Sequence, residues 1–246
     1  KPAPNQFAQS GPMANTVRDT AILLQVLAGF DSRDPGSLRA PVPDMLAGLD
    51  SGVKGLRIGW SADLGYAAID PEVVRITYRA ARALAEQGAA VSEFALDVGE
   101  PWPPFWAIYE ANSYLSYRYL LEERSADLTD YVREALEVGG RITGWEYAQA
   151  LRYVDGLRSR ADELMTRFDL LVTPATAVPA FPTGQPPKTI AGRQIHSFWG
   201  CHPTLFPFNM TGQPAMSVPA GLVGGLPIGV QIVGRRGEDA LALRAA

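Results

Sequence analysis

The sequence LRIGW at residues 56–60 begins the stretch that decides the fold class. It is followed by AVSEF at residues 90–94, and both segments have the length and apolar content of short strands. Between them, DPE at residues 70–72 is a strong helix start, because Asp caps the backbone, Pro suits the first turn and Glu favours the helix N-terminus. A strand, a helix and a strand of this length predict a right-handed parallel crossover and an α/β protein.

Helix and strand patterns continue on both sides of this unit. Before it, apolar residues recur at helical spacing from Thr16 to Gly29, where we expect a helix with one buried face. After it, the predicted elements are helices between residues 105 and 168 with breaks near 126–129 and 139–140, a buried strand at 170–172, a loop at 179–193, strands at 216–218 and 228–233, and a helix that begins at Glu238.

The totals describe an ordinary globular protein and exclude several functional classes. Of the 246 residues, 47% are hydrophobic and 20% are charged, and the formal net charge is −4. Lys and Arg do not cluster, so we expect no nucleic-acid partner. No apolar run approaches the roughly 20 residues that span a bilayer, and the lone Cys201 permits no internal disulfide. We therefore expect no membrane partner and a cytoplasmic location.

No familiar catalytic or metal-binding pattern is present. The Gly-x-Ser-x-Gly turn that many serine hydrolases use does not occur. His196, Cys201 and His202 suggest a metal or thiol site, but Cys201 and His202 are adjacent, so their side chains diverge, and the chain has no second Cys. We expect these residues to lie in a loop where they meet backbone or water, with no metal and no cofactor.

Aromatic residues are unusually dense between residues 102 and 119. One interpretation is that they face the core, with the tyrosine hydroxyls reaching water or a partner. The other is an aromatic wall over an apolar substrate channel. The sequence leaves both interpretations open for Trp102, Phe105, Trp106, Tyr109, Tyr114, Tyr117 and Tyr119.

Four sequence segments are each a weak family signal alone, but their order and spacing together are specific. They are GPMA at residues 11–14, FDLLVTP at 168–174, NMTGQPAMSVPAG at 209–221 and GLPIGVQIVG at 225–234. In this order and spacing they resemble the C-terminal part of an amidase signature enzyme. The resemblance covers nearly the whole chain.

The resemblance implies an α/β/α domain around a large twisted mixed sheet, and amide-bond hydrolysis without a metal or an organic cofactor. In that family two Ser and a Lys carry the reaction, and they lie in an upstream Gly/Ser-rich segment. Nothing here matches them, because Lys54 and Lys188 fall in predicted loops and Ser10 and Ser217 lack the Gly-Gly-x-Ser-type context. We therefore expect residues 1–246 to be the C-terminal portion of a single domain that lacks the upstream catalytic segment, and to be inactive alone.

The resemblance also implies which residues approach a substrate. In the family, the strand that ends near residues 173–174 and the loop around residues 206–213 lie near the reacting centre, and helices like the one at residues 106–109 help to form the acyl or amine channel. No residue of this chain is expected to be catalytic. The predicted substrate-binding residues in the intact enzyme, whose character favours an apolar or aromatic amide, are Trp106, Tyr109, Thr173, Phe206 and Asn209.

Two alternative functions stay open beside hydrolysis of a small-molecule amide. An amidotransferase A-type subunit of the same family releases ammonia from glutamine for tRNA-bound substrates and works in a complex. A non-catalytic scaffold or binding module could keep the fold without the chemistry. Because removing strands from a sheet leaves unpaired backbone groups and apolar surface in water, we also expect the chain to self-associate or to bind the missing N-terminal half.

Overall fold

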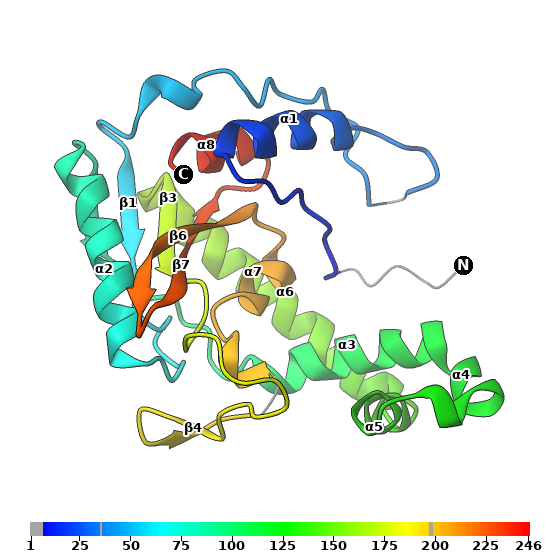
Figure 1. Cartoon of the computed structure of the whole chain (residues 1–246). Helices are drawn as coiled ribbons and strands as arrows, with labels where there is room; N and C mark the ends of the chain where they lie inside the picture. The colour runs from blue at the N-terminus through cyan, green and yellow to red at the C-terminus, as the bar shows by residue number, and fades with distance from the viewer. Residues whose placement is uncertain (1–6, 35, 197–198) are drawn as a thin grey trace.

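The computed structural model describes residues 7–34, 36–196 and 199–246 (Figure 1). The helices are α1 (Val17–Leu27), α2 (Pro71–Glu86), α3 (Trp102–Tyr117), α4 (Tyr119–Glu123), α5 (Asp130–Gly139), α6 (Gly144–Arg167), α7 (Phe206–Thr211) and α8 (Asp239–Arg244), with short 3₁₀ helices η1 (Leu49–Ser51), η2 (Ser125–Asp127) and η3 (Trp199–Cys201). The strands are β1 (Arg57–Trp60), β2 (Ala90–Glu93), β3 (Leu170–Pro174), β4 (Thr189–Ile190), β5 (Arg193–Gln194), β6 (Ala215–Val223) and β7 (Leu226–Gly234). A five-stranded sheet of order β2-β1-β3-β7-β6 confirms the α/β class.

The strand-helix-strand unit forms as the sequence predicts. Strands β1 and β2 pair in parallel, with Arg57 opposite Ala90, and β3 joins the other side of β1 in the same direction. Helix α2 connects β1 and β2, and the Asp70 carboxylate accepts a hydrogen bond of 2.8 Å from the backbone N–H of Glu72. This cap, with Pro71 at the first helical position, fixes where the helix begins.

The other half of the sheet is antiparallel, so the sheet is mixed. Strand β7 pairs antiparallel with β3 on one side and with β6 on the other. The turn between β6 and β7 holds Gly224 and Gly225, whose φ angles are +56° and +81°. Two successive positive φ values suit a tight hairpin and favour glycine. The chain therefore returns beside itself at this point instead of crossing over.

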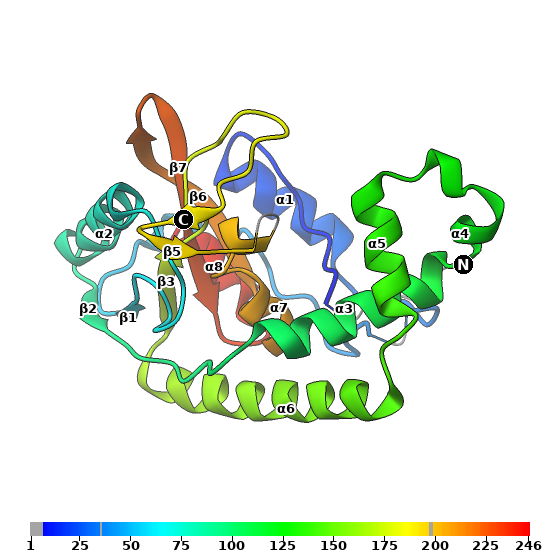
Figure 2. The same ribbon diagram turned by 90° about the horizontal axis from the view of Figure 1, so that it is seen from below.

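Helices cover both faces of the sheet (Figures 1 and 2). Leu170, Val172 and Ile232 lie in a buried cluster with residues of α2 and α8. The alternate residues Leu171 and Val233 point the other way, into the cluster that α6 supplies. This alternation is the two-residue period of a strand, and it leaves β3 fully buried.

A partly exposed ionic contact joins three strands where they meet α6. The carboxylate of Asp169 accepts hydrogen bonds from the guanidinium of Arg57 at 2.9 Å and from that of Arg235 at 2.6 Å. It also accepts the backbone N–H of Arg57 at 2.8 Å. The Arg57 side chain and these further bonds hold the pKa of Asp169 far below its usual value. The contact ties the ends of β1, β3 and β7 together.

One expected loop contains structure that the sequence did not reveal. Within residues 179–193, strand β4 and the first residue of β5 form a small antiparallel hairpin. Its turn consists of Ala191 and Gly192, which have φ angles of +48° and +77°. The pair lacks the Asn or Asp that usually marks such a turn, so local composition predicts only a loop.

Helices α3 to α6 extend from the sheet toward one side of the molecule (Figure 2). Helix α6 begins with a capping box, in which Thr143 and Glu146 satisfy each other's backbone N–H groups. Helix α5 crosses α3 at Gly139, where an added Cβ would lie only 2.2 Å from the Glu110 carbonyl oxygen. Within the described residues, no helix combines the length and the apolar character that a bilayer span needs.

Candidate functional site

An aromatic cluster lies where α3 meets α7. The first half of α3 carries Trp102, Phe105 and Tyr109 at helical spacing, and Phe206 from α7 packs against them. The ring of Phe206 lies 4.4 Å from that of Trp102 and 4.8 Å from that of Phe105. Such close tilted rings bury a large apolar area and hold α7 against α3.

Residues that follow β5 complete the cluster from the other side. The ring of His196 lies 5.4 Å from that of Trp106 and 5.9 Å from that of Trp102. The ring of Trp199 in η3 lies 5.2 Å from that of Tyr109 in an edge-to-face arrangement. Segments nearly 100 residues apart in the sequence thus share one aromatic site.

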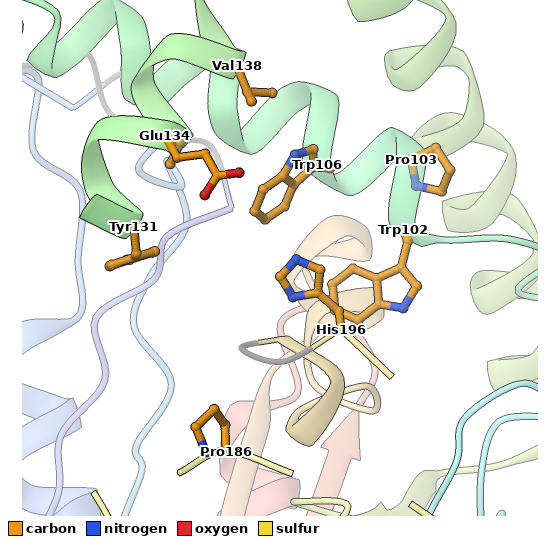
Figure 3. A pocket seen from close by; sticks show the side chains of 9 residues that line it. Trp102, Pro103, Trp106, Tyr131, Glu134, Val138, Pro186 and His196 are labelled. Carbon is orange, nitrogen blue, oxygen red and sulfur yellow. The ribbon is translucent and has the colours of Figure 1, made fainter. Parts of the chain in front are cut away.

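A pocket of about 700 Å³ opens beside this cluster (Figure 3). Helices α3 and α5 form two of its walls, and the loops on either side of the β4–β5 hairpin form the rest. The size lies in the range of small-molecule sites. Its lining residues are Trp102, Pro103, Trp106, Tyr131, Glu134, Ala135, Val138, Pro186 and His196.

The structure brings three of the five predicted substrate-binding residues together. Trp106 lines the pocket directly. Tyr109 and Phe206 belong to the aromatic cluster behind it, where Tyr109 is partly buried and Phe206 is 3% exposed. The cluster therefore combines both interpretations of the aromatic segment, since some rings fill the core and others face a cavity.

Thr173 and Asn209 lie apart from the pocket lining. Thr173 is fully buried in β3, and its hydroxyl accepts a hydrogen bond of 3.0 Å from the side-chain amide of Gln231. Asn209 donates from Nδ2 to the carbonyl oxygen of Phe7 at 3.0 Å, and the Phe7 ring stacks on that of Phe105. Thr173 thus belongs to a buried polar network next to the site, and Asn209 holds the N-terminal segment against the aromatic cluster.

Glu110 is a buried acid one helical turn beyond Trp106. Its side chain is 1% exposed, and within the described residues its Oε2 atom has no hydrogen-bond partner. Burial raises its pKa to about 7. Burial also raises the pKa of the neighbouring Tyr109. Buried groups with raised pKa values near a cavity are typical of functional sites, although buried structural groups show them too.

Cys201 and His202 lack the features of a reactive pair. Burial raises the pKa of the Cys201 thiol and lowers that of His202, so both shifts favour the neutral forms. The described part of the chain contains no group of three or more His, Cys, Asp or Glu side chains that could hold a metal ion. Neither Lys54 nor Lys188 donates a hydrogen bond to a described serine hydroxyl.

Sequence reasoning missed the wall that α5 provides. Tyr131, Glu134, Ala135 and Val138 follow helical spacing, which marks them as one face of α5. That spacing is visible in the sequence, but it does not say that the face borders a cavity. Pro186, in the loop that precedes β4, also lines the pocket, and no pattern in the sequence indicated this.

Comparison with known proteins shows one family. The family model described as Amidase matches residues 1–243. The chain is 32% identical to an acylamidase of Rhodococcus erythropolis over 244 residues, which cover 98% of this chain and 51% of that protein. It is 35% identical to the A subunit of a glutamyl-tRNA(Gln) amidotransferase from Rubrobacter xylanophilus over 266 residues, which cover 97% of this chain and 54% of that protein.

Solved structures agree with this assignment. A bacterial aryl acylamidase described as one of the amidase signature enzymes superposes with a TM-score of 0.87 at 29% identity. The match covers 96% of this chain and 51% of that one. The chain thus spans about half the length of the curated relatives that it matches.

Proposed function

This chain belongs to the amidase signature family, and from that premise we propose that it forms substrate-binding walls of an enzyme that hydrolyses carbon–nitrogen amide bonds. The observation that carries the proposal is the aromatic pocket between α3, α5 and the loops around the β4–β5 hairpin. Aromatic walls of this kind suit an apolar or aromatic acyl or amine group, because they exclude water and offer flat contact surfaces.

We assign substrate contacts to the five residues that the family resemblance implies. Trp106 lies in the pocket wall, and Tyr109 and Phe206 support it from the aromatic cluster. The side chains of Thr173 and Asn209 are already engaged, by Gln231 and by the Phe7 carbonyl. Their contact with substrate requires those bonds to rearrange or the substrate to reach their remaining polar atoms.

We assign no catalytic residue to this chain. The proposed reaction uses a serine nucleophile, a second serine and a lysine, with backbone N–H groups that stabilise the oxyanion. Lys54 and Lys188 form no hydrogen bond with a described serine hydroxyl. We propose that residues 1–246 are the C-terminal portion of a single domain and that the reacting groups lie outside them. A fluorophosphonate probe for activated serines should leave the 246-residue chain unlabelled. Stoichiometric labelling of Ser10 or Ser217 would contradict this assignment.

Steady-state kinetics of the gene product that carries this chain test the proposed function. With 4-nitroacetanilide as substrate, Trp106→Leu should lower kcat/KM by about tenfold, because the ring forms part of the wall. Trp145→Leu is the matched control, since Trp145 is 71% exposed at the start of α6. Equal rates for the two variants, or no hydrolysis of any aryl or alkyl amide, would reject the proposal.

A component of a glutamine-dependent amidotransferase is the second candidate, because one relative of 35% identity is named as the A subunit of a glutamyl-tRNA(Gln) amidotransferase. Such a protein would hydrolyse glutamine and would copurify with partner proteins. Release of ammonia from glutamine, together with capture of stoichiometric partners from native lysate, would favour it. Hydrolysis of aryl amides without partners would favour the acylamidase-like function.

A further inference from the structure

In the part of the chain that the structure describes, the pocket combines several aromatic rings with one carboxylate. Trp102, Trp106, Tyr131 and His196 present rings to it. Among the lining residues that the structure describes, Glu134 is the only Asp, Glu, Lys or Arg. Figure 3 shows its carboxylate directed from α5 toward the ring of Trp106.

The carboxylate of Glu134 does not contribute a polar contact to the described structure. It forms no ion pair or hydrogen bond with the residues that the structure describes. Charged neighbours on α5 are engaged, since Arg133 pairs with Asp130 at 3.2 Å and Glu137 lies 4.0 Å from Arg141. Glu134 is therefore available to a ligand in the pocket.

Aromatic faces and one carboxylate favour the same kind of ligand. The electron-rich face of a Trp or Tyr ring attracts a cation that lies over it. A carboxylate at the rim adds a Coulomb attraction for a cation and repels an anion. The described residues of the lining include no Lys or Arg that would oppose this preference.

We propose that this pocket receives the positively charged end of a ligand, a quaternary ammonium or protonated amine carried on an apolar or aromatic body, and that Glu134 is the specificity residue. The inference rests on the proposed function in one respect: if the ligand is the substrate, the substrates include amides that bear a cationic substituent. The pocket volume of about 700 Å³ accommodates such a group together with an aromatic ring.

Two probes of the same shape, one cationic and one neutral, measure how much the positive charge contributes to binding. The probes are 3-(trimethylammonio)phenol and its neutral isostere 3-tert-butylphenol, titrated against the 246-residue chain by ligand-observed NMR. The cation should bind about tenfold more tightly than the isostere. Glu134→Gln should weaken cation binding about fivefold and leave the neutral probe unchanged.

A matched variant controls for charge on the same helix. Glu137→Gln removes an equal charge three residues along α5, outside the pocket lining, and should leave both affinities unchanged. Trp106→Leu should weaken both probes, because it removes the ring surface that they share. Equal binding of the two probes, no binding of either, or an equal effect of the two Glu variants would overturn the proposal.

Competition separates this inference from the proposed function. If the cation binds but does not inhibit hydrolysis of 4-nitroacetanilide by the gene product, the cation site stands and the pocket is not the substrate site. If hydrolysis depends on Trp106 but the charged and neutral probes bind equally, the substrate site stands and the cation preference is wrong.

Discussion

The protonation of Glu110 is decided by its burial. The side chain lies on α3 with 1% of its surface exposed, and in the described part of the chain its Oε2 atom accepts no hydrogen bond. Its pKa is raised from 4.5 to about 7. A buried carboxyl group without a partner avoids the cost of an isolated charge by keeping its proton.

The raised pKa predicts a pH-dependent stability. Because the folded chain holds the Glu110 proton more tightly than the unfolded chain, its stabilising effect is complete below about pH 4.5 and is lost as the pH rises through about 7. Glu110→Gln keeps a neutral side chain at every pH. It should raise the free energy of unfolding at about pH 8 by up to about 3 kcal/mol, and at about pH 5 by no more than about 1 kcal/mol.

Urea denaturation at several pH values measures this effect. Glu137→Gln serves as the control, because Glu137 is an exposed acid on α5 and should not alter the pH slope. If the slope of stability between about pH 5 and 8 is the same in the native chain and in Glu110→Gln, then burial does not control this group.

At the scale of elements, Gly139 sets how closely α5 approaches α3. An added Cβ would lie 2.2 Å from the carbonyl oxygen of Glu110 and 2.9 Å from the Cβ of Tyr114. The first neighbour is backbone and cannot swing aside. The two helices therefore touch at a point where only a hydrogen atom fits.

Gly139→Ala should push α5 away from α3 and destabilise the chain by about 1–3 kcal/mol. Because α5 carries Tyr131 and Glu134 into the pocket, the same change should weaken binding of 3-(trimethylammonio)phenol. Thermal unfolding and the NMR titration measure the two effects. Gly144→Ala is the control, since its added Cβ meets nothing within 4 Å. Similar stability of the two variants would show that the contact is not tight.

Local signals predicted most of the elements. The cap at Asp70, the break at residues 139–140 and the apolar strand of β3 each depend on neighbours in sequence, and each forms as expected. The β4–β5 hairpin was missed because its turn at Ala191 relies on a positive φ that its side chain does not favour. The Arg193 side chain beside the turn donates hydrogen bonds to the carbonyl oxygens of Tyr66 and Ala67, and Ile190 is buried. Such tertiary contacts leave no local pattern.

The site was predicted less completely than the elements. Aromatic density on α3 indicated Trp106 and Tyr109, and the family resemblance added Phe206, which lies in the same cluster. Glu134 and His196 reach the pocket only because α5 and the segment after β5 converge on α3. Periodicity identifies the face of a helix, but it does not identify what that face meets.

For the whole molecule, apolar surface is concentrated on α1. Only Ala21 of this helix is buried, where it lies in a cluster with Met45 and Leu243. On its outer side, Val26 is 77% exposed and Leu27 is 67% exposed. The sheet also ends in two edge strands, β2 and β6. Exposed apolar side chains and open edges both favour association with another surface.

We therefore predict that the 246-residue chain self-associates through α1. Sedimentation velocity at tens of micromolar should show species larger than a monomer, and Leu27→Lys should shift the distribution toward the monomer by placing a charge in the contact. Leu115→Lys is the matched control, because Leu115 is 61% exposed on the distant helix α3 and should leave the distribution unchanged. A native chain that sediments as a folded monomer would exclude association through α1, and an equal shift by both variants would indicate a general effect of charge.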